Sequence, residues 1–177
     1  MRFHPEFNCT EVIECALEAV RKNANETGAK VQTMLVGPVP ERVHGSAQHI
    51  HQLILMLATS LPDVGGSGAL EIEVSFGAKQ NGNANMLLSL LLASGERDKA
   101  LCRRLTTLAQ ESTTLQTVRW EGPELSLASA WQLALALGGS PFIETTADRK
   151  LRVQISLPFL ATSSLVSKNE PRTGFAI

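Results

Sequence analysis

Histidine and serine side chains that could act as ligands or nucleophiles are present in this sequence, but their spacing does not form a site. His49 and His51 are two residues apart on an expected helix, whereas ligands on one helix face need a spacing of three or four. The segments SGERD (94–98) and SLASA (126–130) lack the G-x-S-x-G pattern of a hydrolase. We therefore expect no catalytic residue and no metal site, and interpret the histidines as surface or hydrogen-bonded side chains.

The cysteines also do not form a recognisable site. Cys9, Cys15 and Cys102 are an odd, scattered set without a C-x-x-C pair. This usage favours reduced thiols in a cytoplasmic protein over a disulfide framework. Cys15 and Cys102 fall on expected helices, where we predict core or half-buried positions.

A glycine loop that leads into a helix is the remaining candidate, because the backbone N–H groups of such a loop can hold phosphate. Residues 121–139, EGPELSLASAWQLALALGG, form an apolar helix that ends in two glycines, but only Gly122 precedes it. Pro123 is expected to stiffen the loop and to remove one donor. Glu124 adds a negative charge where a phosphate would lie.

Composition excludes several classes of partner. The chain has 177 residues, 44% of them hydrophobic, and a formal net charge of -1. A near-neutral charge argues against nucleic acid and anionic membrane as partners. No apolar run approaches the length of a membrane span, and the N-terminus lacks the pattern of a signal peptide.

The periodicity of apolar residues predicts four helices and a mostly antiparallel sheet. Expected helices cover about 10–27 (capped by Thr10 and stopped by Gly28), 46–61 (stopped by Pro62 and the glycines after it), 99–110 and 125–137. Expected strands cover 30–36, 70–76, 86–94, 115–120, 142–146 and 151–159, with hairpin turns at 77–85 and around ADRK (147–150). This order implies an α+β two-layer sandwich with the helices on one face. Residues 1–160 form one expected domain, and the polar segment 161–177 is interpreted as a tail or linker.

Over about residues 7–159, the sequence resembles the ATP-binding catalytic domain of sensor histidine kinases. That fold is shared with type II topoisomerases, heat-shock ATPase chaperones and MutL. The segment FNCTEVIECALEAVRKNANETGAKVQ is similar to the first helix and strand of the family. SLASAWQLALALGGSPFIE matches its last long helix, double glycine and following strand, and LRVQISLPF matches its closing strand.

The resemblance keeps the scaffold but loses the first nucleotide-binding box. In the family, the second helix has an Asp and an Arg before two Asn residues four apart, which serve magnesium and the triphosphate, and often a Lys three residues later. The matching positions here, with the intervening glutamine, are Ser46, His49, Gln52, Met56, Ser60 and Asp63. Magnesium prefers hard oxygen ligands to a methionine sulfur, and an aspartate repels phosphate.

The other two boxes are degenerate as well. In the family, D-x-G-x-G follows a strand and its Asp accepts a hydrogen bond from adenine. The three defined positions here are Ala93, Gly95 and Arg97. The G-x-G-x-G box before the last helix is represented by Gly122, Glu124 and Ser126. If each lost hydrogen bond costs about 1–3 kcal/mol, nucleotide affinity falls by several decades.

The resemblance therefore implies a degenerate domain that lacks ATP turnover. No acid lies between Gln48 and Leu61 to act as the general base of the related ATPases. We expect Met56, Leu92 and Leu127 to fill the surface that meets adenine in the family. Because the three boxes are degenerate, we expect no bound cofactor; ATP and magnesium would bind only if the domain is still catalytic. The resemblance implies that dimers form through the phospho-accepting helical hairpin of the family, and since this sequence does not contain that hairpin, we expect a monomer.

Two functions follow from the resemblance. The first is a regulatory or docking module of bacterial two-component phosphorelay signalling, whose partners are a response-regulator receiver domain or other domains of a longer sensor protein. The alternative is a divergent catalytic domain that still binds Mg-ATP and phosphorylates a histidine on another domain. A lone anti-sigma-type kinase on the same fold fits less well, because it too needs the Asn and Gly boxes.

Overall fold

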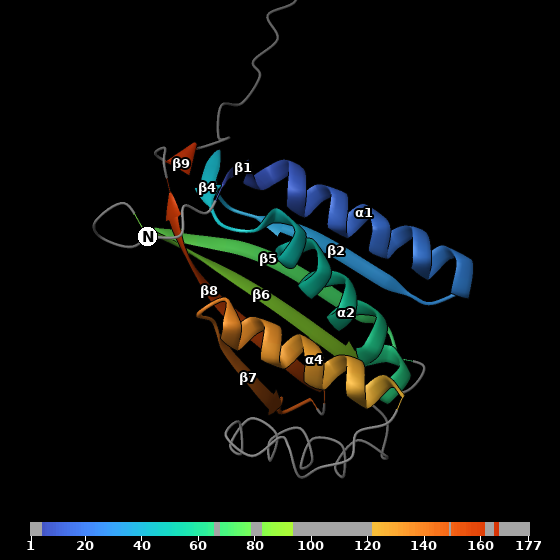
Figure 1. Ribbon diagram of the computed structural model, residues 1–177. Coiled ribbons are helices and arrows are strands. Elements are labelled where there is room, and N and C mark those ends of the chain that lie inside the picture. Colours follow the sequence, from blue (N-terminus) through green and yellow to red (C-terminus); the bar gives the residue numbers. More distant parts are fainter. Residues whose placement is uncertain are drawn as a thin grey trace, which may run out of the picture.

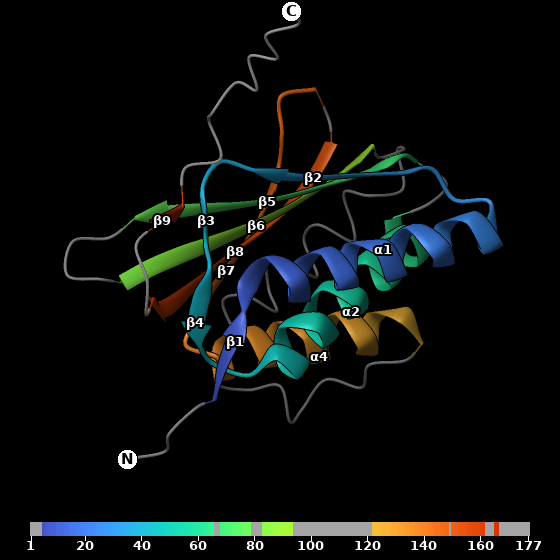
Figure 2. The same cartoon turned by 90° about the horizontal axis from the view of Figure 1, so that it is seen from above.

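The computed structural model describes residues 5–65, 68–78, 83–93, 122–148, 150–161 and 165–166. Three helices form one layer and the strands form the other, as Figures 1 and 2 show. The helices are α1 (Cys9–Thr27), α2 (Ala47–Gly65) and α4 (Pro123–Ala136). The strands are β1 (Glu6–Asn8), β2 (Val31–Val36), β3 (Val39–Pro40), β4 (Arg42–His44), β5 (Leu70–Ala78), β6 (Asn83–Ala93), β7 (Ser140–Thr145), β8 (Lys150–Ala161) and β9 (Leu165–Val166).

The main sheet has the order β1-β4-β8-β6-β5-β2, and β7 pairs with β8 beside the first part of that strand. All pairs in it are antiparallel except β2 with β5, which are parallel. Because the three helices lie on one face, the predicted α+β two-layer sandwich with a mostly antiparallel sheet is confirmed.

The core lies between the sheet and the helix layer. Alternate residues of the central strands face the helices and are fully buried, as the period of two requires: Ile72, Val74, Leu88, Leu90, Val153 and Ile155. Side chains from one face of α1 and of α2 cover them, including Ile13, Leu17, Leu53 and Leu57. No helix in the described residues is long and apolar enough to cross a bilayer.

The ends of α1 and α2 correct two predictions. The N-cap of α1 is Asn8, whose Oδ1 accepts a hydrogen bond from the Glu11 backbone N–H (3.1 Å), whereas Thr10 lies inside the helix. Its predicted stop at Gly28 is confirmed, with a left-handed φ of 73°. Pro62 does not end α2, which continues to Gly65. A proline removes only its own N–H donor, so later residues can still bond to the preceding turn.

The hairpin between β5 and β6 is tighter than the sequence suggests. Their ladder extends to the pair Ala78–Ala84, so residues expected in the turn belong to the strands. Small polar residues favour turns, but an antiparallel neighbour can hold them extended. The expected helix at 99–110 and strand at 115–120 lie outside the described residues.

The C-terminal part of the fold is held by a double glycine and a short extra strand. A Cβ on Gly139 would lie 2.8 Å from the Ala134 carbonyl oxygen, so only glycine fits there. Leu165–Val166, expected in a tail or linker, pairs with β3 as a small second sheet. That part of the tail therefore belongs to the fold. Strands of two or three residues are too short to produce a periodic pattern.

Candidate functional site

The predicted nucleotide positions lie on three elements at one end of the molecule. The second half of α2, the end of β6 and the start of α4 lie at this end in Figures 1 and 2. The helix α2 packs against both α4 and β6. The predicted positions in the second half of α2, at the end of β6 and at the start of α4 therefore lie at the same end of the molecule, whereas Gln52 lies in the first half of α2.

The side chains of α2 offer no ligand to magnesium at the two Asn positions. Met56 is half-buried and packs against the core. Ser60 is only 2% exposed, and its hydroxyl donates a hydrogen bond to the Met56 carbonyl oxygen of the preceding turn. Gln52 is exposed on the same helix, and Asp63 lies in the last part of α2. A buried hydroxyl that is bonded to its own helix cannot also reach a ligand in solvent.

The adenine position lies at the last residue of β6. Ala93 pairs with Lys150 of β8, and its N–H donates to the Ala69 carbonyl oxygen (3.0 Å). A methyl side chain cannot accept a hydrogen bond from an adenine amino group. Gly95 and Arg97 lie outside the described residues.

The start of α4 differs from the expected loop. Pro123 is the first residue of the helix, and Gly122 precedes it with φ 58°. The prediction that Pro123 stiffens a loop is therefore wrong. Proline fits the first helical position, because its missing N–H has no partner within the helix.

Glu124 gives the N-terminus of α4 a negative charge. It is half-buried in the first turn, where the helix dipole stabilises a carboxylate. Ser126 is exposed and does not cap the helix. An approaching phosphate would meet this carboxylate at the helix end that usually attracts anions.

Two of the three side chains expected to fill the adenine surface are fully buried. Leu92 and Leu127 have no exposed surface, and Met56 packs on the same core. Residues 94–121, which join β6 to α4, lie outside the described residues. The filled pocket therefore stays a prediction.

The remaining candidate residues that the structure describes differ in exposure. His49 is exposed, and His44 and His51 are half-buried. The described part of the chain contains no group of three residues able to hold a metal ion. Cys15 is exposed, contrary to expectation, because it lies on the polar face of α1. Cys9, which the sequence analysis did not place, is buried, and burial raises the pKa of its thiol to about 12.

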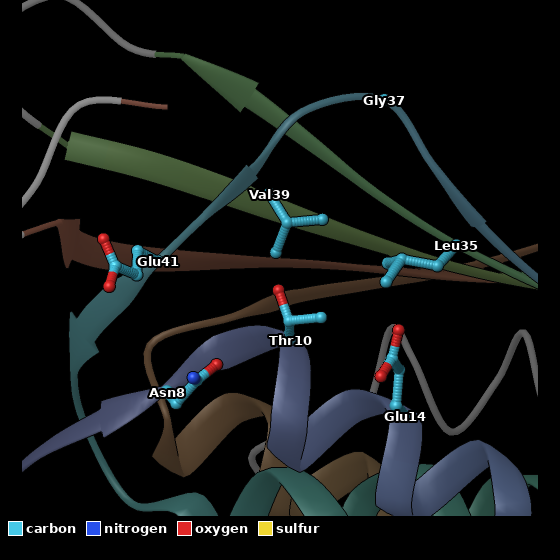
Figure 3. A pocket seen from close by; sticks show the side chains of 7 residues that line it. All are labelled: Asn8, Thr10, Glu14, Leu35, Gly37, Val39 and Glu41. Carbon is cyan, nitrogen blue, oxygen red and sulfur yellow. The ribbon is translucent and has the colours of Figure 1, made fainter. Parts of the chain in front are cut away.

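Two hollows among the described residues were not predicted. The first, about 530 Å³ in volume, lies between the start of α1 and the β2–β3 corner (Figure 3). The second lies between the ends of α1 and α2, where the hydroxyls of Thr27 and Thr59 are bonded to their own helices. Each hollow is lined by separate segments, and no motif in the sequence signals such a meeting.

Ser60→Asn is expected to lower the free energy of unfolding by about 1–3 kcal/mol, because a larger amide would enter a filled, buried position. Thr59→Asn is the matched control. Thr59 is the exposed neighbour on α2, and its hydroxyl also bonds to its own helix. Urea unfolding followed by circular dichroism measures the free energy of unfolding of both variants. Equal stabilities of the two variants would contradict the description of Ser60 as a core position.

No protein-family model and no curated protein matches the sequence. The mycobacterial sensor histidine kinase MprB matches in structure with TM-score 0.56 and 17% identity, over 90% of this chain and 99% of that one. A nucleotide-free catalytic domain of the histidine kinase ThkA matches with TM-score 0.60 and 15% identity, over 89% of this chain and 98% of that one. Full-length ShkA in complex with AMPPNP matches with TM-score 0.62 and 15% identity, over 93% of this chain and 32% of that one. The chain therefore has the fold of histidine kinase catalytic domains.

Proposed function

We propose that this chain is a degenerate histidine-kinase ATP-binding domain that acts as a regulatory or protein-docking module in two-component phosphorelay signalling. It does so in the cytoplasm and without turnover of ATP. Its partner is a response-regulator receiver domain or another domain of a longer sensor protein. The proposal rests on the fold together with the residues at the nucleotide positions, since a fold alone does not fix a function.

The observation that carries the proposal is the burial of the side chains at the two asparagine positions of α2. The two positions that would hold magnesium and triphosphate are a methionine packed on the core and a serine buried at 2% exposure. Neither presents an oxygen to solvent, and Mg²⁺ binds almost exclusively through oxygen. Ala93 and Glu124 support the same conclusion at the adenine and phosphate ends of the site.

A divergent kinase domain that binds Mg-ATP through other residues is the second candidate. Its support is the structural match to ShkA, which was determined in complex with AMPPNP. On this alternative, the protein would transfer phosphate to a histidine on another domain, and Gln52, Gly95 and Gly122 would be the first positions to mutate.

Titration with Mg-ATP and Mg-ADP separates the two candidates. We expect no saturable heat in calorimetry and no shift in melting temperature at millimolar nucleotide. A ligand at about 100 times its Kd would stabilise the folded state by about 2.7 kcal/mol, which a melting curve detects readily. ShkA is the positive control under the same buffer conditions.

Saturable binding with a shift in melting temperature would overturn the proposed loss of nucleotide binding and support the kinase. A silent titration leaves the docking role to be tested directly, with isolated receiver domains in the same calorimeter. Binding to a receiver domain is expected to be insensitive to added Mg-ATP.

A further inference from the structure

The hollow beside the start of α1 is a groove with an apolar floor and an acidic rim. Figure 3 shows Leu35 and Val39 on the β2–β3 side, and Thr10 and Glu14 facing them from α1. Leu35 and Val39 are half-buried and pack against the core. The groove has a volume of about 530 Å³, and its walls come from the start of α1 and from the β2–β3 corner.

The charge of the groove is entirely negative among its lining residues. Glu14 and Glu41 are exposed, and neither side chain has an ion-pair partner within the described part of the chain. Among the described residues that line it, none is a lysine or an arginine. The fitting occupant is therefore a segment with both cationic and apolar side chains.

The chain itself delivers such a segment to the rim of the groove. Strand β9 is antiparallel to β3, with Leu165 opposite Pro40 and Val166 opposite Val39. Val166 therefore lies beside Val39, which lines the groove together with Gly37. The next eleven residues are SKNEPRTGFAI (167–177), with two cations, one acid and the apolar group Phe175-Ala176-Ile177.

We propose that residues 167–177 bind in this groove, with Lys168 and Arg172 against Glu14 and Glu41 and with Phe175 on the floor formed by Leu35 and Val39. An extended chain covers about 3.3 Å per residue, so the segment is long enough to pass the Gly37 corner and follow α1. The occupied groove would hold this segment away from other partners. The inference does not depend on nucleotide binding and stands apart from the proposed function.

Limited trypsin digestion of the full chain tests this proposal, because Lys168 and Arg172 are themselves cleavage sites. Cleavage of a docked segment follows the population of the released state when docking is fast. We expect slower cleavage after both residues than in a free peptide of residues 163–177. In the Glu14→Gln/Glu41→Gln variant, cleavage is expected to accelerate by about 2- to 30-fold, the range for two exposed ion pairs.

Glu26→Gln is the matched control. Glu26 is an exposed glutamate of α1, three turns beyond Glu14 and outside the groove, and its replacement is expected to leave the rate unchanged. Equal rates in the wild type and the free peptide would overturn the proposal, as would equal rates in the wild type and the double variant. Protection that grows with protein concentration would also overturn it, because the groove would then hold the segment of a second copy. Melting curves of the variants check that each one folds.

Discussion

Replacing Trp131 with alanine is expected to lower the free energy of unfolding by about 3–5 kcal/mol, the range for truncating a large aromatic side chain in a core. Trp131 is 2% exposed at the middle of α4, between fully buried Leu127 and Ala134. The helix packs against α2 and β7, so the cavity would open where the two helices meet the sheet. The loss is a large fraction of the stability of an ordinary domain.

Urea unfolding followed by circular dichroism measures this effect without relying on tryptophan fluorescence. Leu125→Ala is the control, since Leu125 is on the same helix with 51% of its surface exposed, and a change within about 0.5 kcal/mol is expected. If the two substitutions lower the free energy of unfolding equally, α4 does not pack through Trp131 as described.

Gly68→Ala is expected to cost at least about 3 kcal/mol, the upper part of the range for overpacking a rigid site. A Cβ added at Gly68 would collide with the carbonyl oxygen of Ala93. That oxygen belongs to the backbone at the end of β6, whose position is also fixed by the Ala93 N–H bond to Ala69. The obstacle cannot rotate away as a side chain would, so one of the two strand ends must move.

Gly77→Ala provides the matched comparison, because a Cβ on Gly77 would meet nothing within 4 Å. There the substitution is expected to stabilise the protein by about 0.4–1 kcal/mol, since it restricts the unfolded chain. Both variants are compared by thermal and urea unfolding. A Gly68→Ala variant as stable as wild type would mean that β6 does not end against residue 68.

These two positions stabilise the fold near the predicted nucleotide positions. Trp131 and Gly68 hold α4 and the end of β6 in place through packing and close backbone approach, and neither contact needs a ligand. Met56 and Ser60 add to the same core from the positions where the kinase family has asparagine.

Much of the fold could be predicted from the sequence, because its signals are local. Apolar residues at a spacing of three and four gave α1 and α2, and alternation gave β5 and β8. Gly28 stops α1 as predicted, since a left-handed residue needs no tertiary contact to be recognised. The replacement of both asparagines by Met56 and Ser60, and the retention of only Gly95 and Gly122 at the glycine positions, can likewise be read from the sequence itself.

Only the tertiary structure decided what the side chains at those positions do. From the sequence Ser60 could have been a polar ligand, but in the structure it is buried and its hydroxyl donates to the Met56 carbonyl oxygen of its own helix. The exposure of Cys15, the burial of Cys9, the pairing of Leu165–Val166 with β3 and the acidic groove beside α1 also depend on segments far apart in the chain. Burial and charge environment arise from contacts between such segments, and no local pattern of residues encodes them.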